Sequence, residues 1–171
     1  MENKKLIKEM AELQVLCVRW IERNSQVKFE TYGDLDRVLL EGKFTTTYKE
    51  GVKNLRKNIE NLCKNQYLLE SVLKLENDID NSEIGDLRFG LEPQRKFTDL
   101  EKELDMEMLK IKLAMLNKMA SIKFVAEHLR ITESAIKQAC QQERLLNTRK
   151  VSNTWEVHIP ECIKYWNLEE K

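Results

Sequence analysis

Apolar residues recur three and four positions apart through most of the first 120 residues. In residues 4–23 these positions are Leu6, Met10, Leu13, Leu16, Cys17 and Trp20. In residues 45–77 they are Val52, Leu55, Ile59, Leu62, Leu69 and Leu73, with the polar Gln66 at one position of the same stripe. In the third segment, residues 98–118, they are Leu100, Leu104, Met108, Ile111 and Met115, and Met119 follows at the same spacing. This period places the apolar side chains on one face of an α-helix. The chain is therefore predicted to be mostly α.

The stripe in residues 45–77 alternates spacings of three and four, which is the heptad pattern of a packed helical interface. The sequence predicts one long helix here, and Gln66 is its single polar position on the stripe. Two readings stay open. The helix is either one member of an intramolecular bundle or part of a coiled-coil-like interface that forms a homodimer.

The segments between these helices are polar and contain turn-forming residues. Residues 24–33 are expected to be a connection with a short extended piece near residues 27–29. Residues 34–40 are expected to form one or two helical turns that end at Gly42. Residues 76–86 and the segment that follows, to Arg95, are predicted to be an acidic, irregular linker. Thr98 and Glu101 have the spacing of a capping box at the start of the third helix.

Composition argues against several classes of function. The chain lacks an 18-residue apolar run and a signal-peptide h-region, so we expect a cytoplasmic protein with no membrane partner. The four cysteines, Cys17, Cys63, Cys140 and Cys162, are too far apart for a zinc site and are expected to be buried thiols. Asp78, Asp80 and Ser82 resemble a calcium loop, but Glu83 and Phe89 occupy its required Gly and Glu positions.

Recognisable catalytic patterns are also missing from the sequence. It has neither a nucleophile elbow nor a phosphate-binding glycine loop. His128 and His158, the two histidines, have no partner at a spacing that suggests catalysis or metal binding. We therefore expect a protein that is not an enzyme and that binds neither a cofactor nor a metal.

Charge is unevenly distributed although the formal net charge is zero. Residues 1–116 hold 20 Lys and Arg against 22 Asp and Glu, a net of −2. Residues 118–150 hold 7 basic residues (Lys118, Lys123, Arg130, Lys137, Arg144, Arg149 and Lys150) against 3 acidic ones, a net of +4. A local basic excess is the electrostatic feature expected of a nucleic-acid-binding surface.

The last 50 residues contain signals for two short helices followed by a hairpin. Ser121 and Thr132 stand where they would cap helices, with Arg130-Ile131 as the break between them. Phe124, Val125 and Leu129 are expected to form the inner face of the first helix, and Ile136, Ala139 and Cys140 that of the second. Two short helices joined by such a turn are typical of a helix-turn-helix.

Two strands and a closing helix are predicted after these helices. Leu145-Leu146 is expected to return to the core. Residues 148–151 and 154–157 read as strands joined by Ser152-Asn153. Pro160 suits the first turn of a helix over residues 161–166.

These elements together resemble the excisionase-like, MerR-related family of winged helix-turn-helix DNA-binding proteins. The resemblance covers residues 120–167 and rests on Ser121, Val125-Ala126, Thr132, Ile136, Leu145, Trp155 and Ile159-Pro160, in that order. Members of the family often have Gly in the turn, where this chain has Arg130. A left-handed backbone at Arg130 would cost about 1 kcal/mol, so either Arg130 accepts that strain or the turn is built differently.

The resemblance implies a recognition helix from Thr132 to about Glu143 and a basic hairpin wing. Gln, Lys and Ser side chains suit base edges in the major groove, and basic wing residues suit phosphate or the minor groove. The predicted DNA-binding residues are Thr132, Glu133, Ser134, Lys137, Gln138, Gln141, Arg149, Lys150 and Asn153.

We therefore expect two domains. Residues 1–116 would be a helical domain for dimerisation or partner binding, and residues 117–171 a winged helix-turn-helix. The favoured function is sequence-specific binding of double-stranded DNA by a transcriptional regulator or excisionase-like factor of a mobile genetic element. The alternative is a phage inhibitor of a protein partner, similar to anti-CRISPR proteins, with a fused autoregulatory helix-turn-helix. A third reading has the winged module bind protein instead of DNA.

Overall fold

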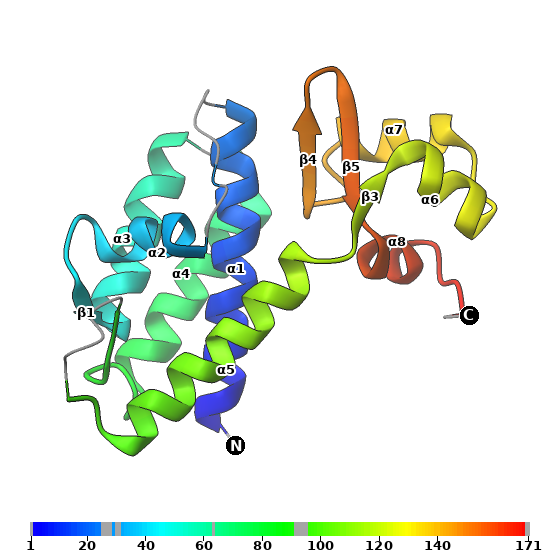
Figure 1. The fold of residues 1–171 in the computed structure, drawn as a ribbon. Coiled ribbons are helices and arrows are strands. Elements are labelled where there is room, and N and C mark those ends of the chain that lie inside the picture. Colours follow the sequence, from blue (N-terminus) through cyan, green and yellow to red (C-terminus); the bar gives the residue numbers. More distant parts are fainter. Residues whose placement is uncertain (1, 25–28, 30–31, 63, 91–95, 170–171) are drawn as a thin grey trace. The chain divides into compact units, whose positions relative to one another are not determined.

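A computed structural model describes residues 2–24, 29, 32–62, 64–90 and 96–169 of the chain (Figure 1). The described residues form eight helices and five short strands, which confirms the expected mostly helical class. The chain divides into two compact units, Met1–Leu113 (unit 1) and Ala114–Lys171 (unit 2). The boundary falls inside the fifth helix.

Unit 1 is a bundle of helices with one small strand pair. Its helices are α1 (Glu2–Asn24), α2 (Tyr32–Leu40), α3 (Tyr48–Leu62), α4 (Gln66–Asp80) and α5 (Asp99–Leu116), whose last residues belong to unit 2. Most of the predicted stripe of α1 is confirmed, because Leu6, Met10, Leu13, Cys17 and Trp20 are buried, while Leu16 is half-buried. The expected turns of helix near residues 34–40 are α2, and Gly42 follows with φ +80°.

The single long helix predicted over residues 45–77 is wrong. The chain forms α3 and α4 instead, and the two helices pack against each other (Figure 1). Asn65 ends the connection by capping α4, since its side chain accepts a hydrogen bond from the Leu68 amide. A side-chain cap of this kind starts a new helix where the apolar spacing alone predicts continuation.

After this break, the buried positions differ from those that the apolar spacing predicts. Val52, Leu55 and Ile59 of α3 are buried as predicted. In α4 the buried residues are Leu68, Val72, Leu75 and Ile79, whereas Leu73 is 45% exposed and Gln66 is exposed beside Glu70. Val52, Leu55 and Ile59 of α3 therefore lie in the core of this unit, as the intramolecular reading expects.

A two-stranded antiparallel ribbon joins the two ends of the α3–α4 hairpin. β1 (Thr45–Thr47) pairs with β2 (Arg88–Gly90), with Thr46 opposite Phe89. The sequence predicted helix at β1 and an irregular linker from residue 76, so both expectations are wrong here: α4 continues to Asp80 and β2 follows a turn. Phe89 stabilises the ribbon because its ring stacks on the buried Tyr48 ring at 4.8 Å between centroids. The short strands lack enough alternation to be read from sequence.

α5 begins as predicted and buries Leu104 and Met108 of the predicted stripe, but Glu101 and Lys112 complete its buried face. Thr98 and Glu101 form the expected capping box: the Glu101 amide donates to Thr98 Oγ1 at 3.2 Å, and the Thr98 amide donates to Glu101 Oε1 at 2.9 Å. The buried side chains are Glu101, Leu104, Met108 and Lys112. Leu100, predicted to be apolar core, is 43% exposed, and Met119 lies beyond the helix in a strand.

A buried ion pair explains why a charged residue takes this inner position. Lys112 Nζ lies 2.5 Å from Asp36 Oδ1 of α2, and both side chains are almost fully buried. The pair forms only when α2 and α5 pack together, because Asp36 and Lys112 are 76 positions apart in the sequence. Apolar spacing carries no information about such a contact.

Unit 2 combines three helices with a three-stranded antiparallel sheet. Along the chain come β3 (Met119–Ser121), α6 (Ile122–Leu129), α7 (Glu133–Gln141), β4 (Thr148–Val151), β5 (Thr154–His158) and α8 (Ile159–Tyr165). β5 is the central strand, with β3 on one side and β4 on the other. The predicted hairpin is therefore confirmed as β4–β5, and β3 is a strand that the sequence did not predict.

The core of unit 2 is a small apolar cluster. Its buried members are Ile122, Val125, Ala126, Ile136, Ala139, Cys140, Leu145, Val157 and Cys162. The return of Leu145 to the core is confirmed, and Pro160 lies in the first turn of α8 as expected. Phe124 was expected in this core, but it is 51% exposed because Ile122 takes the inner position on α6.

Two further expectations concern the whole chain. Among the described helices, none is both long and apolar enough to cross a membrane. Cys17, Cys140 and Cys162 are buried thiols as expected, while Cys63 and the proposed extended piece at residues 27–28 fall outside the described residues.

Candidate functional site

α6 and α7 are joined by a three-residue turn whose geometry is determined by two caps and one left-handed residue. Ser121 caps α6 and Thr132 caps α7, each accepting a hydrogen bond from a backbone amide two or three residues inside its helix. Arg130 has φ 57° and ψ 43°, and the Ile131 amide donates to the Ala126 carbonyl at 3.1 Å. Arg130 thus adopts the left-handed conformation that the sequence raised as one alternative.

α7 has one buried face and one broad solvent-exposed face. Ile136, Ala139 and Cys140 are buried, as predicted. The predicted site residues Thr132, Glu133, Ser134, Lys137, Gln138 and Gln141 are all exposed. With about 100° of rotation per residue, Lys137 lies on one flank of the exposed arc, Gln138 on the other, and Gln141 between them.

The β4–β5 hairpin presents different residues on its two faces. Lys150 is opposite Trp155 and Arg149 is opposite Glu156. Because neighbouring strand residues point to opposite faces, the hairpin carries Lys150 and Trp155 on one face and Arg149 and Glu156 on the other. The Lys150 ammonium lies 5.8 Å from the centre of the Trp155 ring. The turn at Ser152, with φ 56°, places Asn153 at the exposed tip.

A groove of about 450 Å³ runs between α7, the hairpin and the start of α6. Each of these three elements contributes three residues to the lining of the groove. The lining residues are Ser121, Ile122 and Lys123 from the start of α6, Glu133, Ser134 and Lys137 from α7, and Asn153, Thr154 and Trp155 from the hairpin. Glu133, Ser134, Lys137 and Asn153 were predicted as one site, and this groove brings them together.

The other predicted residues lie around the groove or away from it. Lys150 is next to the groove through its contact with Trp155. Gln138 lines a separate hollow of about 140 Å³, together with Arg144, Tyr165 and Trp166. Arg149 is on the hairpin face opposite to Lys150. The predicted set is therefore divided, with the flank of α7 that carries Lys137 facing the hairpin.

Charge in the groove is mainly positive. Lys123 and Lys137 line it and Lys150 adjoins it, whereas Glu133 is its one carboxylate. Glu133 stands in the first turn of α7, where a negative charge interacts favourably with the helix dipole. The groove therefore suits an anionic ligand, with one lysine each from α6, α7 and the hairpin.

Sequence reasoning missed five residues of the groove as site residues: Ser121, Ile122, Lys123, Thr154 and Trp155. Lys123 belonged to the local basic excess, and Trp155 to the family resemblance, so a signal existed for both. The sequence did not show that these residues lie close together in space. The unpredicted β3 pairs with β5, which brings Ser121 opposite Glu156 and thus places the start of α6 beside the hairpin.

One cysteine and the two histidines of unit 2 have contacts that the structure describes. Burial raises the pKa of Cys162 to about 12, so its thiol is neutral. His158 Nε2 is 3.3 Å from the Ala114 carbonyl oxygen, and the His128 ring stacks on Phe124. Within the described residues, the structure contains no cluster of three or more His, Cys, Asp or Glu side chains that could hold a metal ion.

Comparisons with known proteins add no family to this description: the chain matched no family model, no curated protein and no solved structure.

Proposed function

We propose that unit 2 is a winged helix-turn-helix module that binds double-stranded DNA, with α7 as the recognition helix and the β4–β5 hairpin as the wing. One observation carries the proposal. Exposed polar side chains of α7 and of the hairpin tip line the same groove, and the three lysines give that groove a positive charge. A helix flanked by a basic hairpin is a shape that can enter the major groove while the hairpin contacts the neighbouring backbone.

The residues in and around the groove fall into two groups, those that would contact phosphates and those that would contact bases. Lys123 and Lys150 would contact phosphates, since they lie at the sides of the groove. Ser134, Lys137 and Gln141 lie on the outer arc of α7 and would face base edges. Arg149 points to the other hairpin face, so we expect a smaller contribution from it than the sequence predicted.

The test is binding of labelled duplex DNA to the full-length chain, measured by anisotropy at several salt concentrations. Two phosphate contacts, from Lys123 and Lys150, predict a slope of log affinity against log salt of about −2. Replacing Lys123 and Lys150 by Ala should weaken binding to all duplexes and reduce the slope by about 2. Replacing Lys137 by Ala should reduce discrimination between sequences.

Lys164→Ala is the matched control, because Lys164 is an exposed lysine on α8 that lies outside the groove. Glu133→Gln tests whether negative charge in the groove opposes DNA binding. Binding should become tighter when this carboxylate is removed. If the lysine variants bind duplex DNA like the wild-type chain, or if wild-type binding is independent of salt, the proposal is wrong.

We further propose that the chain acts as a regulator or excisionase-like factor of a mobile element, working as a dimer. A single small module contacts few base pairs, and two copies on a two-fold site increase specificity. Val52, Leu55 and Ile59 of the predicted heptad are buried within unit 1, so a dimer would have to use other surfaces. Tyr67 and Leu73 of α4 and Met106 and Leu113 of α5 are exposed apolar candidates. Sedimentation of the full-length chain with Leu73→Glu and Leu113→Glu variants tests this arrangement.

A further inference from the structure

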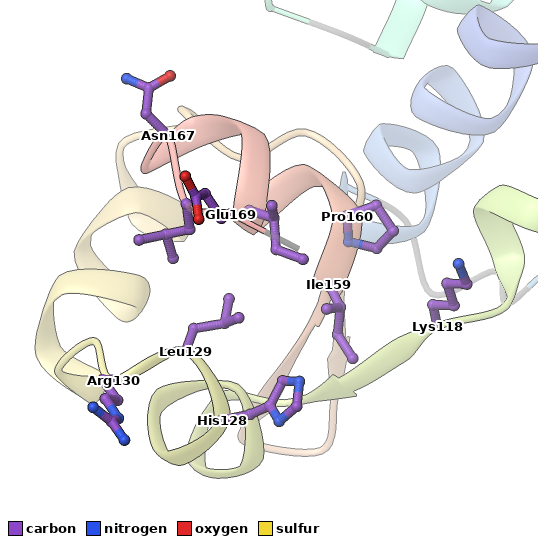
Figure 2. A pocket seen from close by; sticks show the side chains of 10 residues that line it. Lys118, His128, Leu129, Arg130, Ile159, Pro160, Asn167 and Glu169 are labelled. Carbon is purple, nitrogen blue, oxygen red and sulfur yellow. The ribbon is translucent and has the colours of Figure 1, made fainter. Parts of the chain in front are cut away.

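A second cavity of unit 2, of about 570 Å³, shares no residue with the groove described above. It lies between the end of α6, the length of α8 and the segment after α8. Its apolar lining comes from Leu129 on α6, from Ile159, Pro160 and Ile163 on α8, and from Leu168. In Figure 2 the Leu129 and Ile159 side chains face the centre of this cavity.

Charged residues stand at the margins of the same cavity. Figure 2 shows Lys118 on one side and Arg130 on the opposite side, with His128 between them along the lower edge. Glu169 is the one carboxylate of the lining. Among the described residues, neither Lys118 nor Arg130 takes part in an ion pair. The lining therefore combines apolar walls with two cations that have no carboxylate partner.

The backbone holds both cations in an uncommon conformation. Lys118 has φ 60° and Arg130 has φ 57°, in the left-handed region that few residues other than Gly adopt without cost. Each residue ends a helix or precedes a strand at the edge of the cavity, so its position follows from the turn itself. The backbone positions of these two residues on opposite sides of the cavity therefore follow from their turns.

We propose that this cavity binds an amphipathic carboxylate, a small molecule with an aliphatic body and one anionic group. The apolar body would lie against Leu129, Ile159 and Ile163, and the carboxylate would reach Lys118 or Arg130. The volume falls in the range of about 300–1,000 Å³ that small-molecule sites occupy. A protein partner would need about 800 Å² of surface on this side, which is much more than the cavity offers.

The experiment uses decanoate and decanol as matched probes on the full-length chain, with the methyl groups of Ile and Leu followed by NMR. Decanoate should shift the methyl signals of Leu129, Ile159, Ile163 and Leu168 while leaving Ile136 and Leu145 of the core unchanged. Decanol, which has the same body without the charge, should bind more weakly. Equal affinity for the two probes, shifts centred elsewhere, or no binding of decanoate at millimolar concentration would each overturn the proposal.

Two variants separate the contributions of charge and shape. Lys118→Gln with Arg130→Gln should weaken decanoate binding about fivefold and leave decanol binding unchanged. Ile163→Trp should fill the cavity and weaken both probes about tenfold or more. Lys164→Gln, which removes an α8 charge outside the cavity, is the control and should change neither. If the charge variant binds decanoate like the wild-type chain, the assignment of the cations is wrong, even where Ile163→Trp fails to fold.

This inference is independent of DNA binding. Because the two cavities share no residue, the Ile163→Trp variant should bind duplex DNA with wild-type affinity if DNA binding is the function. Failure of the wild-type chain to bind DNA would leave the decanoate titration to decide the ligand site by itself.

Discussion

Units 1 and 2 bury polar groups in different ways. Unit 1 holds charged and amide side chains deep inside, including Gln14, Asn54, Glu101 and the Lys112–Asp36 pair. The buried core cluster of unit 2 is entirely apolar. Its buried polar residues, Asn147, Thr148 and His158, lie next to that cluster, and Asn147 donates to the Met115 carbonyl at 2.8 Å. Unit 1 thus buries charged groups in its interior, whereas the central cluster of unit 2 is apolar and its buried polar residues lie outside that cluster.

The difference indicates where each unit is sensitive to substitution. A buried ion pair is strongly destabilising when one partner is removed, because the other charge stays without compensation. A helix cap contributes less, since water can replace part of it. Four predictions test this contrast, all measured in the full-length chain by amide hydrogen exchange, which reports the stability of each unit separately.

The largest effect is expected from Lys112→Met in α5. This change leaves the Asp36 carboxylate buried without its ammonium partner, so unit 1 should lose about 3–5 kcal/mol. The double variant Lys112→Met with Asp36→Leu should recover most of that loss, because neither charge remains. Lys110→Met, an exposed lysine of the same helix, is the control. If the double variant is as unstable as the single one, the unpaired Asp36 charge is not the cause of the stability loss.

A pH-dependent loss of stability is expected next, from Asp105 in unit 1. Burial, and then the nearby Asp36 carboxylate, raise the pKa of Asp105 from 3.8 to about 6. The folded state therefore holds this proton more tightly than the unfolded state. The resulting stabilisation is complete below pH 3.8 and is lost as the pH rises through about 6. Because Asp105 is only partly buried, solvent screens part of the effect, and a loss of about 1–2 kcal/mol is expected.

Asp105→Asn provides the comparison for this pH dependence. The amide does not titrate. The stability of unit 1 in this variant should therefore no longer fall between pH 4 and pH 7.5 through the titration of residue 105. Unit 2 in the same samples is the internal control. An unchanged profile in Asp105→Asn would assign the pH dependence to other groups.

A smaller effect is expected from Thr132→Ala in unit 2. The Thr132 hydroxyl accepts a hydrogen bond from the Ala135 amide at 3.1 Å and caps α7. Its removal should cost about 1 kcal/mol, seen as faster exchange in α7. Ser134→Ala, two residues further on the exposed face, should cost less. Equal losses at both positions would mean that the cap contributes nothing particular.

The smallest effect, a gain, is expected from Arg130→Gly. Gly adopts the left-handed conformation of this turn without a steric penalty, and unit 2 should become about 0.5 kcal/mol more stable. Glu127→Gly inside α6 should instead lose about 1 kcal/mol. A destabilised Arg130→Gly chain would indicate that the Arg130 side chain makes a contact worth more than the backbone strain.

Prediction from sequence succeeded where the signal was local. Ser121, Thr132 and the Thr98–Glu101 box form the caps expected of them, because a cap involves residues only two or three positions apart. The hairpin over residues 148–157 was found for the same reason. The exposed face of α7 followed from its three buried residues.

Prediction failed where burial depended on distant residues. The stripe through residues 52–73 has uninterrupted spacing, yet Asn65 caps a new helix that buries Leu68 and exposes Leu73. Leu100 and Phe124 are apolar but lie outside their cores. β1, β2 and β3 are only three residues each and exist through partners far along the chain.

The sequence by itself determined the mostly helical class, the caps, the hairpin and the polar face of α7, since each depends on neighbours within a turn of helix or a two-residue loop. The tertiary structure alone decided that Lys112 is buried against Asp36, and that Lys123 and Trp155 join Lys137 in one groove. These arrangements require strands and helices from separate parts of the chain to meet, and the free energy of burial depends on what each side chain meets there.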